Sequence, residues 1–274
     1  MNNRLLSFIL ILFILPVCYG CKDKTADSKT ADKTIPVIDY VYVNSYPHDI
    51  TSFTEGLLIH NGSLFESTGA EKGLSQTKSL FGIVDLKTGT IDTKAEIDKV
   101  KYFGEGITFL NGKIFQLTYK TKIGFVYDAI SFEKIKEFTF PSDEGWGLTT
   151  DGKSLIMSDG TNILTCLDPD TFQVIKTIPV TADGYRINRL KLNELEYING
   201  FVFANIWPTT TIAKIDLTDG KIIGRLNLDS LANEARRINP RSFEMNGIAY
   251  DSITNSFFVT GKLWPKIYEI KLRN

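Results

Sequence analysis

Short apolar or alternating runs recur from residue 36 to the end of the chain, and helical periodicity is scarce there. Four pairs of turn residues each separate two such runs: Asn61-Gly62, Asn111-Gly112, Asp151-Gly152 and Asn199-Gly200. A type I′ turn needs positive φ at both central residues, which Asn, Asp and Gly tolerate best. Each pair is therefore predicted to join two antiparallel strands in a hairpin.

A second marker follows each hairpin in step with the first. Strand-like runs end at an aspartate that opens a turn, at Asp85, Asp128, Asp168 and Asp216. Both series repeat at intervals of roughly 40 to 50 residues, the period of a four-stranded β-propeller blade. Residues 36–274 hold five such units, so we predict an all-β fold, a five-bladed β-propeller that forms one domain.

The two ends of this region are predicted to close the ring together. The fifth unit ends after three strands, and the strand-like run 37–43 has no unit of its own. If this run is the outermost strand of the last blade, no open sheet edge remains. A β-sandwich is the alternative fold, but it would not explain two markers that repeat in step.

The first strand of each blade lines the central channel of a propeller. The repeat therefore predicts five side chains that face the channel: Glu55, Glu105, Trp146, Asn193 and Asn246. The alternative is that these polar groups form no functional site and are only hydrated and hydrogen-bonded to one another.

The N-terminus has a composition of its own. Arg4 precedes the apolar run 5–17, which is too short to span a bilayer and is typical of a secretory signal. We expect 1–20 to be a lipoprotein signal peptide, with Cys21 lipidated after cleavage. A plain secreted signal, or lipidation at Cys18, is the alternative. Residues 22–34 contain no large apolar side chain, so 21–35 are predicted to be a flexible tether. These features predict export to the bacterial periplasm or cell envelope, with membrane contact only through the lipid.

The overall charge narrows the class of partner. With 31 basic and 32 acidic residues the net charge is -1, which argues against nucleic acid. His48 and His60 have no Cys or His at ligand spacing, so no metal site is predicted. Because glutamate and asparagine are predicted to face the channel, a Ca²⁺ ion bound there by oxygen ligands remains an alternative. Cys166 is predicted to be a buried core residue of a strand. We also expect the protein to be a monomer.

Ten short motifs, in order along the chain, resemble the plant-type and bacterial glutaminyl cyclases, also called glutamine cyclotransferases. The resemblance runs from about Tyr46 to Leu272. The motifs are YPHD at 46–49, FTEG at 53–56, ESTG at 66–69, FGEG at 103–106, EGWGL at 144–148, SDG at 158–160, LNELE at 192–196, ANIW at 204–207, NGIAYD at 246–251 and VTGKLWP at 259–265. The resemblance implies a five-bladed propeller that converts the N-terminal glutamine of peptides to pyroglutamate and releases ammonia.

The resemblance also implies roles for individual residues. Glu105 corresponds to the family's proton-transfer residue, and Asn193 and Lys262 correspond to the groups that assist at the amide oxyanion. The substrate pocket would be lined by Phe53, Phe103, Trp146 and Trp207.

This sequence departs from the family at two positions of the implied pocket. Glu55 stands where the family usually has glutamine, which adds charge near the substrate amine or raises the pKa of nearby acids. Tyr119 stands where it usually has tryptophan, which keeps an aromatic face. These two departures leave undecided which substrate the pocket prefers.

Cyclisation is intramolecular, so it requires a folded substrate side chain and proton transfer but no activated nucleophile and no cofactor. Two other functions remain open at this point. The first is a non-catalytic surface lipoprotein that binds a peptide or glycan in the aromatic pocket. The second is a Ca²⁺-dependent hydrolase of the lactonase kind, which a chelator would inactivate.

Overall fold

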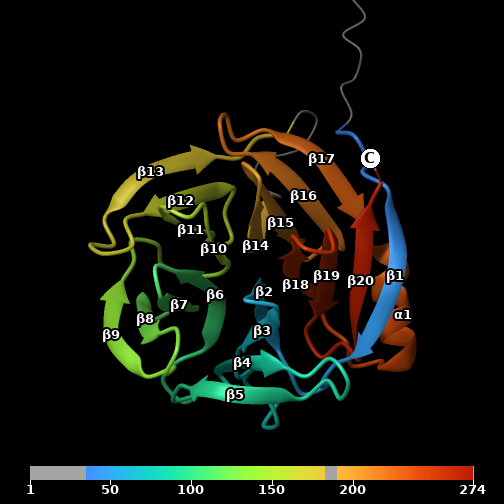
Figure 1. Cartoon of the computed structure of the whole chain (residues 1–274), viewed down its shortest axis with the longest axis horizontal. Helices are drawn as coiled ribbons and strands as arrows, with labels where there is room; N and C mark the ends of the chain where they lie inside the picture. The colour runs from blue at the N-terminus through green and yellow to red at the C-terminus, as the bar shows by residue number, and fades with distance from the viewer. Residues whose placement is uncertain (1–34, 183–189, 274) are drawn as a thin grey trace, which may run out of the picture. The chain divides into compact units, whose positions relative to one another are not determined.

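The computed structural model describes residues 35–182 and 190–273 of the chain. In it, five four-stranded antiparallel sheets surround a common centre as the blades of a propeller (Figure 1). The first strand of each blade lies nearest the centre and the fourth lies outermost. The predicted five-bladed, all-β fold is therefore confirmed.

The first two blades follow the chain without interruption. Blade one consists of β2 (Thr54–His60), β3 (Ser63–Thr68), β4 (Leu80–Val84) and β5 (Ile91–Glu96). Blade two consists of β6 (Gly104–Leu110), β7 (Lys113–Thr118), β8 (Ile123–Asp128) and β9 (Lys134–Thr139).

The next two blades repeat this order. Blade three consists of β10 (Leu148–Thr150), β11 (Leu155–Met157), β12 (Ile163–Leu167) and β13 (Val174–Pro179). Blade four consists of β14 (Lys191–Ile198), β15 (Phe201–Trp207), β16 (Thr211–Asp216) and β17 (Ile222–Asn227).

The last blade joins the two ends of the described chain. It combines β18 (Met245–Asp251), β19 (Ser256–Gly261) and β20 (Lys266–Leu272) with β1 (Tyr40–Pro47), which pairs antiparallel with β20 (Figure 1). The predicted closing strand thus begins at Tyr40 rather than at residue 37. Val37 instead bridges to Arg225 in blade four, so the N-terminal segment contacts both blades that flank the closure.

A buried histidine links the end of β1 to two blades. The Nδ1 atom of His48 lies 2.7 Å from the Trp264 carbonyl oxygen, and Nε2 lies 3.1 Å from both Glu66 carboxyl oxygens. Because both ring nitrogens face acceptors, the doubly protonated imidazolium form satisfies both contacts. Burial alone would lower the pKa of His48, but the Glu66 charge and hydrogen bonds more than offset this and the pKa is raised.

Three of the four predicted type I′ turns are confirmed by positive φ at both central residues, as in Asn61 (49°) and Gly62 (75°). At Asp151-Gly152 the predicted hairpin forms, since β10 pairs antiparallel with β11, but its turn is not of type I′. There, β10 ends at Thr150 and β11 begins at Leu155, so the connection is longer. The Asp151 carboxylate accepts hydrogen bonds from the backbone N–H groups of Lys153 and Ser154, which replaces the two-residue turn by an Asx turn.

The sequence pattern did not predict the helix α1 (Asp229–Ile238), which lies between β17 and β18 in the sequence. Its buried face consists of Leu231, Ala232 and Ala235, which pack in one apolar cluster with Trp264 and other residues of blade five. In the described part of the chain no helix is long and apolar enough to cross a membrane. The predicted signal peptide, Cys21 and the tether up to residue 34 lie outside the described residues, whereas Ile35 is buried.

Candidate active site

Four first strands carry a β-bulge at the residue that the repeat predicted to face the channel. The register breaks around Glu55 in β2, Glu105 in β6, Asn193 in β14 and Asn246 in β18. A bulge leaves a residue out of the ladder and redirects its side chain. The same local device therefore points a polar group inward from four blades.

Blade three differs from this pattern. Trp146 was predicted to lie on a first strand, but β10 begins only at Leu148. The Trp146 backbone instead accepts a hydrogen bond from the Gly106 N–H at 2.8 Å. Its side chain still reaches the cavity that the other four blades surround.

The inner strands approach one another so closely that glycine is required. A Cβ atom on Gly106 would lie 2.4 Å from the Leu148 nitrogen, and one on Gly147 would lie 2.2 Å from the Asn193 carbonyl oxygen. Blade four carries Glu194 at the corresponding step. The Glu194 carboxylate accepts hydrogen bonds from the backbone N–H groups of Leu57 and Ile248, so it ties blade four to blades one and five.

Small polar residues on the second strands hold the bulges in place. Ser67 donates to the Glu105 carbonyl oxygen at 2.6 Å, and Ser158 donates to the Asn193 carbonyl oxygen at 2.7 Å. Asn205 accepts from the Gly247 N–H at 3.1 Å. These three residues belong to the motifs ESTG, SDG and ANIW, for which no role was predicted. A polar residue that recurs at a similar step in several blades could have revealed them.

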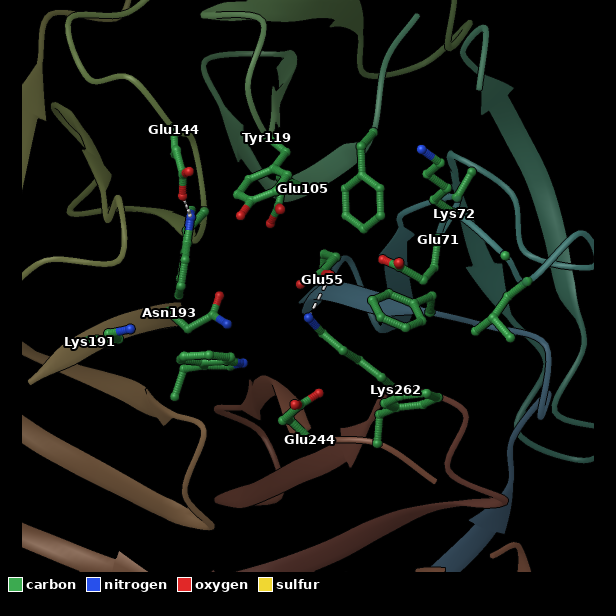
Figure 2. Close-up of a pocket in the computed structure, with 18 residues that line it drawn as sticks. Glu55, Glu71, Lys72, Glu105, Tyr119, Glu144, Lys191, Asn193, Glu244 and Lys262 are labelled. Atoms are coloured by element: carbon green, nitrogen blue, oxygen red, sulfur yellow. Dashed lines mark hydrogen bonds and ion pairs between the residues drawn. The ribbon is translucent and has the colours of Figure 1, made fainter. Parts of the chain in front are cut away.

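Three of the four bulged residues, Glu55, Glu105 and Asn193, line a cavity of about 880 Å³. Figure 2 shows its lining, in which Glu105, Asn193 and Lys262 approach a common space from three blades. Every predicted catalytic and substrate-binding residue lines it: Phe53, Glu55, Phe103, Glu105, Tyr119, Trp146, Asn193, Trp207 and Lys262. The predicted channel residue Asn246 does not line the cavity but donates to Glu55 at 2.9 Å.

A buried ion pair forms part of the cavity floor. The Lys262 Nζ atom lies 2.7 Å from a Glu55 carboxyl oxygen, and the two side chains are 10% and 3% exposed (Figure 2). Burial alone would lower the pKa of Lys262, but the charges of Glu55 and Glu105 raise it overall. Lys262 is thus a cation, held between two carboxyl groups.

Glu105 lacks such a partner. One of its carboxyl oxygens is buried with no hydrogen bond in the described structure. Burial, and then the charge of Glu55, raise the pKa of Glu105 well above its ordinary value. Burial also raises the pKa of Glu55, to about 7, against the opposing effect of Lys262.

The three groups titrate together, because two carboxyl groups share one ammonium. The ion pair with Lys262 favours the ionised form of Glu55, and one carboxyl oxygen of Glu105 has no comparable partner in the described structure. The Asn193 amide oxygen is likewise buried without a hydrogen-bond partner in the described structure. Buried polar atoms are rarely left unpaired, so these two atoms indicate where a ligand would bind.

Aromatic rings form a continuous wall around this floor. Ring centroids are 6.0 Å apart for Phe53 and Phe103, 5.9 Å for Phe103 and Tyr119, and 6.5 Å for Tyr119 and Trp146. Trp207 follows 6.0 Å from Trp146, edge to face. The wall therefore combines all five aromatic residues that were predicted for the pocket.

Several lining residues were missed, and all but Lys191, the first residue of β14, lie in connections that do not share the repeat. They are Ala70, Glu71, Lys72, Gly73, Leu74, Glu144, Lys191, Phe243 and Glu244. Glu144 has a clear structural effect, since it accepts a hydrogen bond from the Trp146 indole at 3.0 Å and pairs with Lys120. It fixes the orientation of the Trp146 ring, the fourth of the five in the wall.

No group of three or more His, Cys, Asp or Glu side chains is arranged to hold a metal ion within the ranges that the structure describes. Cys166 is buried in an apolar cluster, and burial raises the pKa of its thiol, which makes it a poor nucleophile.

Comparison with known proteins gives consistent results. Residues 14–272 match the glutamine cyclotransferase family. A glutaminyl-peptide cyclotransferase of Arabidopsis thaliana is 40% identical over 98% of this chain and 81% of its own. The crystal structure of a Myxococcus xanthus glutaminyl cyclase superposes with a TM-score of 0.75 at 29% identity, over 86% of this chain and 98% of that one. The chain belongs to the glutamine cyclotransferase family.

Proposed function

We propose that this protein is a glutaminyl-peptide cyclotransferase, which converts an N-terminal glutamine to pyroglutamate with release of ammonia. The observation that carries the proposal is a buried, unpartnered carboxyl group, Glu105, beside Asn193 and Lys262 in an aromatic cavity. The relatives that match most of the chain carry this activity in their names.

Proton transfer is the role proposed for Glu105. The substrate's α-nitrogen attacks the carbonyl carbon of its own side-chain amide, so both reacting groups arrive on one molecule. The α-nitrogen must lose protons, and the leaving amide nitrogen must gain them. A carboxyl group whose pKa is raised toward neutral pH suits both transfers.

The developing oxyanion is stabilised in this scheme by two donors. Lys262 supplies an ammonium and Asn193 an amide N–H, both in a buried site where such interactions are strong. The methylenes of the glutamine side chain pack against the aromatic wall. The cavity volume of about 880 Å³ leaves space for residues that follow the glutamine in a peptide.

One assay separates the three functions considered. Ammonia release from a glutamine-initiated dipeptide is measured with and without EDTA. The proposal expects turnover that EDTA leaves unchanged. Saturable binding without ammonia would support the binding protein, and activity that EDTA abolishes would indicate the Ca²⁺-dependent hydrolase. No cofactor is expected.

We also propose that the protein is exported and acts as a monomer anchored to the cell envelope through Cys21. The short apolar run 5–17 and the polar segment after Cys21 support this. The substitution Cys21→Ser should move the protein from membranes to the soluble fraction while ammonia release stays at the parental rate. Identical fractionation of variant and parent would contradict the anchor.

A further inference from the structure

The charges on the cavity floor are unbalanced. Two carboxyl groups, Glu55 and Glu105, face one ammonium, Lys262, and all three side chains are buried. The Lys262 ammonium is 2.7 Å from Glu55, while one oxygen of Glu105 has no hydrogen-bond partner in the described structure. The carboxyl groups of the floor thus outnumber its ammonium by one, which leaves negative charge for one more cation.

We propose that Glu55 and Glu105 together form a receptor for the protonated α-amino group of the substrate, and that Glu55 makes the cavity select the ammonium form over the neutral amine. This inference rests on the proposed function and specifies which form of the peptide the site accepts. On binding, the substrate's ammonium competes with Lys262 for Glu55. Lys262 then has an N–H free for the amide oxygen.

One cation, one neutral amide and three further acidic groups act on Glu55 from the surrounding blades. Lys262 follows β19, Asn246 donates a neutral amide from β18, and Glu105 approaches from β6. Glu244, just before β18, and Glu71, in the connection between β3 and β4, both act on Glu55 as additional negative charges. Acidic groups from three blades therefore surround the position of the proposed cation.

The ammonium form also balances the reaction. The α-nitrogen enters with three protons and keeps one in the lactam ring. A bond forms between this nitrogen and the side-chain carbonyl carbon, and the bond from that carbon to the amide nitrogen breaks. The two protons lost by the α-nitrogen pass to the leaving nitrogen, the first through Glu105, so ammonium departs and no proton is taken from solvent.

A matched pair of non-reactive ligands tests the proposal. Norleucyl-glycinamide has the α-amine and a side chain of similar length to glutamine, whereas hexanoyl-glycinamide lacks only the amine. Calorimetry of the parent protein from pH 5 to 9 measures both affinities. Norleucyl-glycinamide should bind about tenfold tighter near pH 7, as a charge-assisted hydrogen bond implies. This advantage should be lost toward pH 5, as Glu55, whose pKa is raised to about 7, takes up a proton, and toward pH 9, as the amine loses its proton.

Two substitutions localise the effect. Glu55→Gln should reduce the advantage of the amine to about twofold, and Glu55→Asp should restore part of it. The matched control Glu244→Gln removes a charge from the rim and should leave most of the advantage. Equal preference in the parent and in Glu55→Gln, or a preference that keeps growing up to pH 9 in the parent, would overturn the proposal.

The parent's own pH profile needs no variant, so the proposal can be tested even if Glu55→Gln misfolds. If only the proposed function is wrong, the result is different: the ligand with the amine is still preferred as described, but no ammonia is released from a glutamine-initiated dipeptide.

Discussion

In the proposed mechanism, Glu105 is the residue on which the chemistry depends most directly. Glu105→Gln keeps the shape of the side chain but cannot accept a proton, so kcat should fall by about 10² to 10⁴ with little change in KM. Ammonia release from a glutamine-initiated dipeptide measures both parameters, and circular dichroism establishes that the variant is folded. Turnover at the parental rate would show that Glu105 is not the proton carrier, and Glu55 would be the next carboxyl group to test.

Trp207 is expected to act on binding rather than on the chemical step. Its ring is the end of the aromatic wall and lies 6.0 Å from that of Trp146. Because the wall contacts the substrate methylenes before and during ring closure alike, Trp207→Ala should raise KM by about tenfold while kcat changes little. A loss confined to kcat would mean that this ring positions the reacting groups instead.

The predicted site residues were recoverable from sequence because their positions repeat with the blades. Glu55, Glu105 and Asn193 occupy the same step of inner strands, and family motifs supplied Lys262 and the aromatic partners. The ion pair between Glu55 and Lys262 was not recoverable, since it joins blades one and five and depends on bulge geometry. The rim acids Glu71 and Glu244 lie in irregular connections, for which no period exists to reveal them.

Among the elements, the end of β1 carries a pH-dependent contribution to stability. The pKa of His48 is raised above its ordinary value of 6.5 in the folded protein. Stabilisation by its charged form is therefore fully present below pH 6.5 and is lost as the pH rises through the raised pKa. His48→Gln should lower the melting temperature most near pH 6, and the difference from the parent should shrink in alkaline solution.

Thermal unfolding of both proteins from pH 5 to 9 measures this difference. Removal of one member of a buried ion pair typically costs about 3 to 5 kcal/mol, because Glu66 would remain buried and unpaired. A difference in melting temperature that does not vary with pH would show that the histidine is neutral in the folded protein.

One turn and one helix differ from what the sequence pattern predicts. Three Asn-Gly turns form as predicted because φ is positive at both residues, whereas Asp151 satisfies its own backbone with its carboxylate. Helix α1 escaped prediction because only Leu231, Ala232 and Ala235 of its ten residues are buried. Such a short apolar stripe gives a weak periodic signal in a chain that is otherwise made of strands.

At the scale of the whole molecule, ring closure depends on one outer strand. Tyr40 to Pro47 pair with Leu272 to Lys266, and Val37 adds a bridge to blade four. A truncated chain that begins at residue 48 would expose the edge of β20 to solvent. We expect it to unfold at lower urea concentration than a chain that begins at residue 35, or to aggregate. Equal unfolding midpoints for the two truncated chains would contradict a closing role for β1.

The pairing of β1 with β20 also constrains when the protein can fold. During synthesis β1 leaves the ribosome first among the strands, yet its partner is made last. Blades one to four can each form from contiguous chain, but the fifth has to wait for the C-terminus. Joining such distant segments is entropically costly and slow. The unpaired first strand is consequently available to a chaperone, or to a translocation channel, for nearly the whole time that the chain is being made.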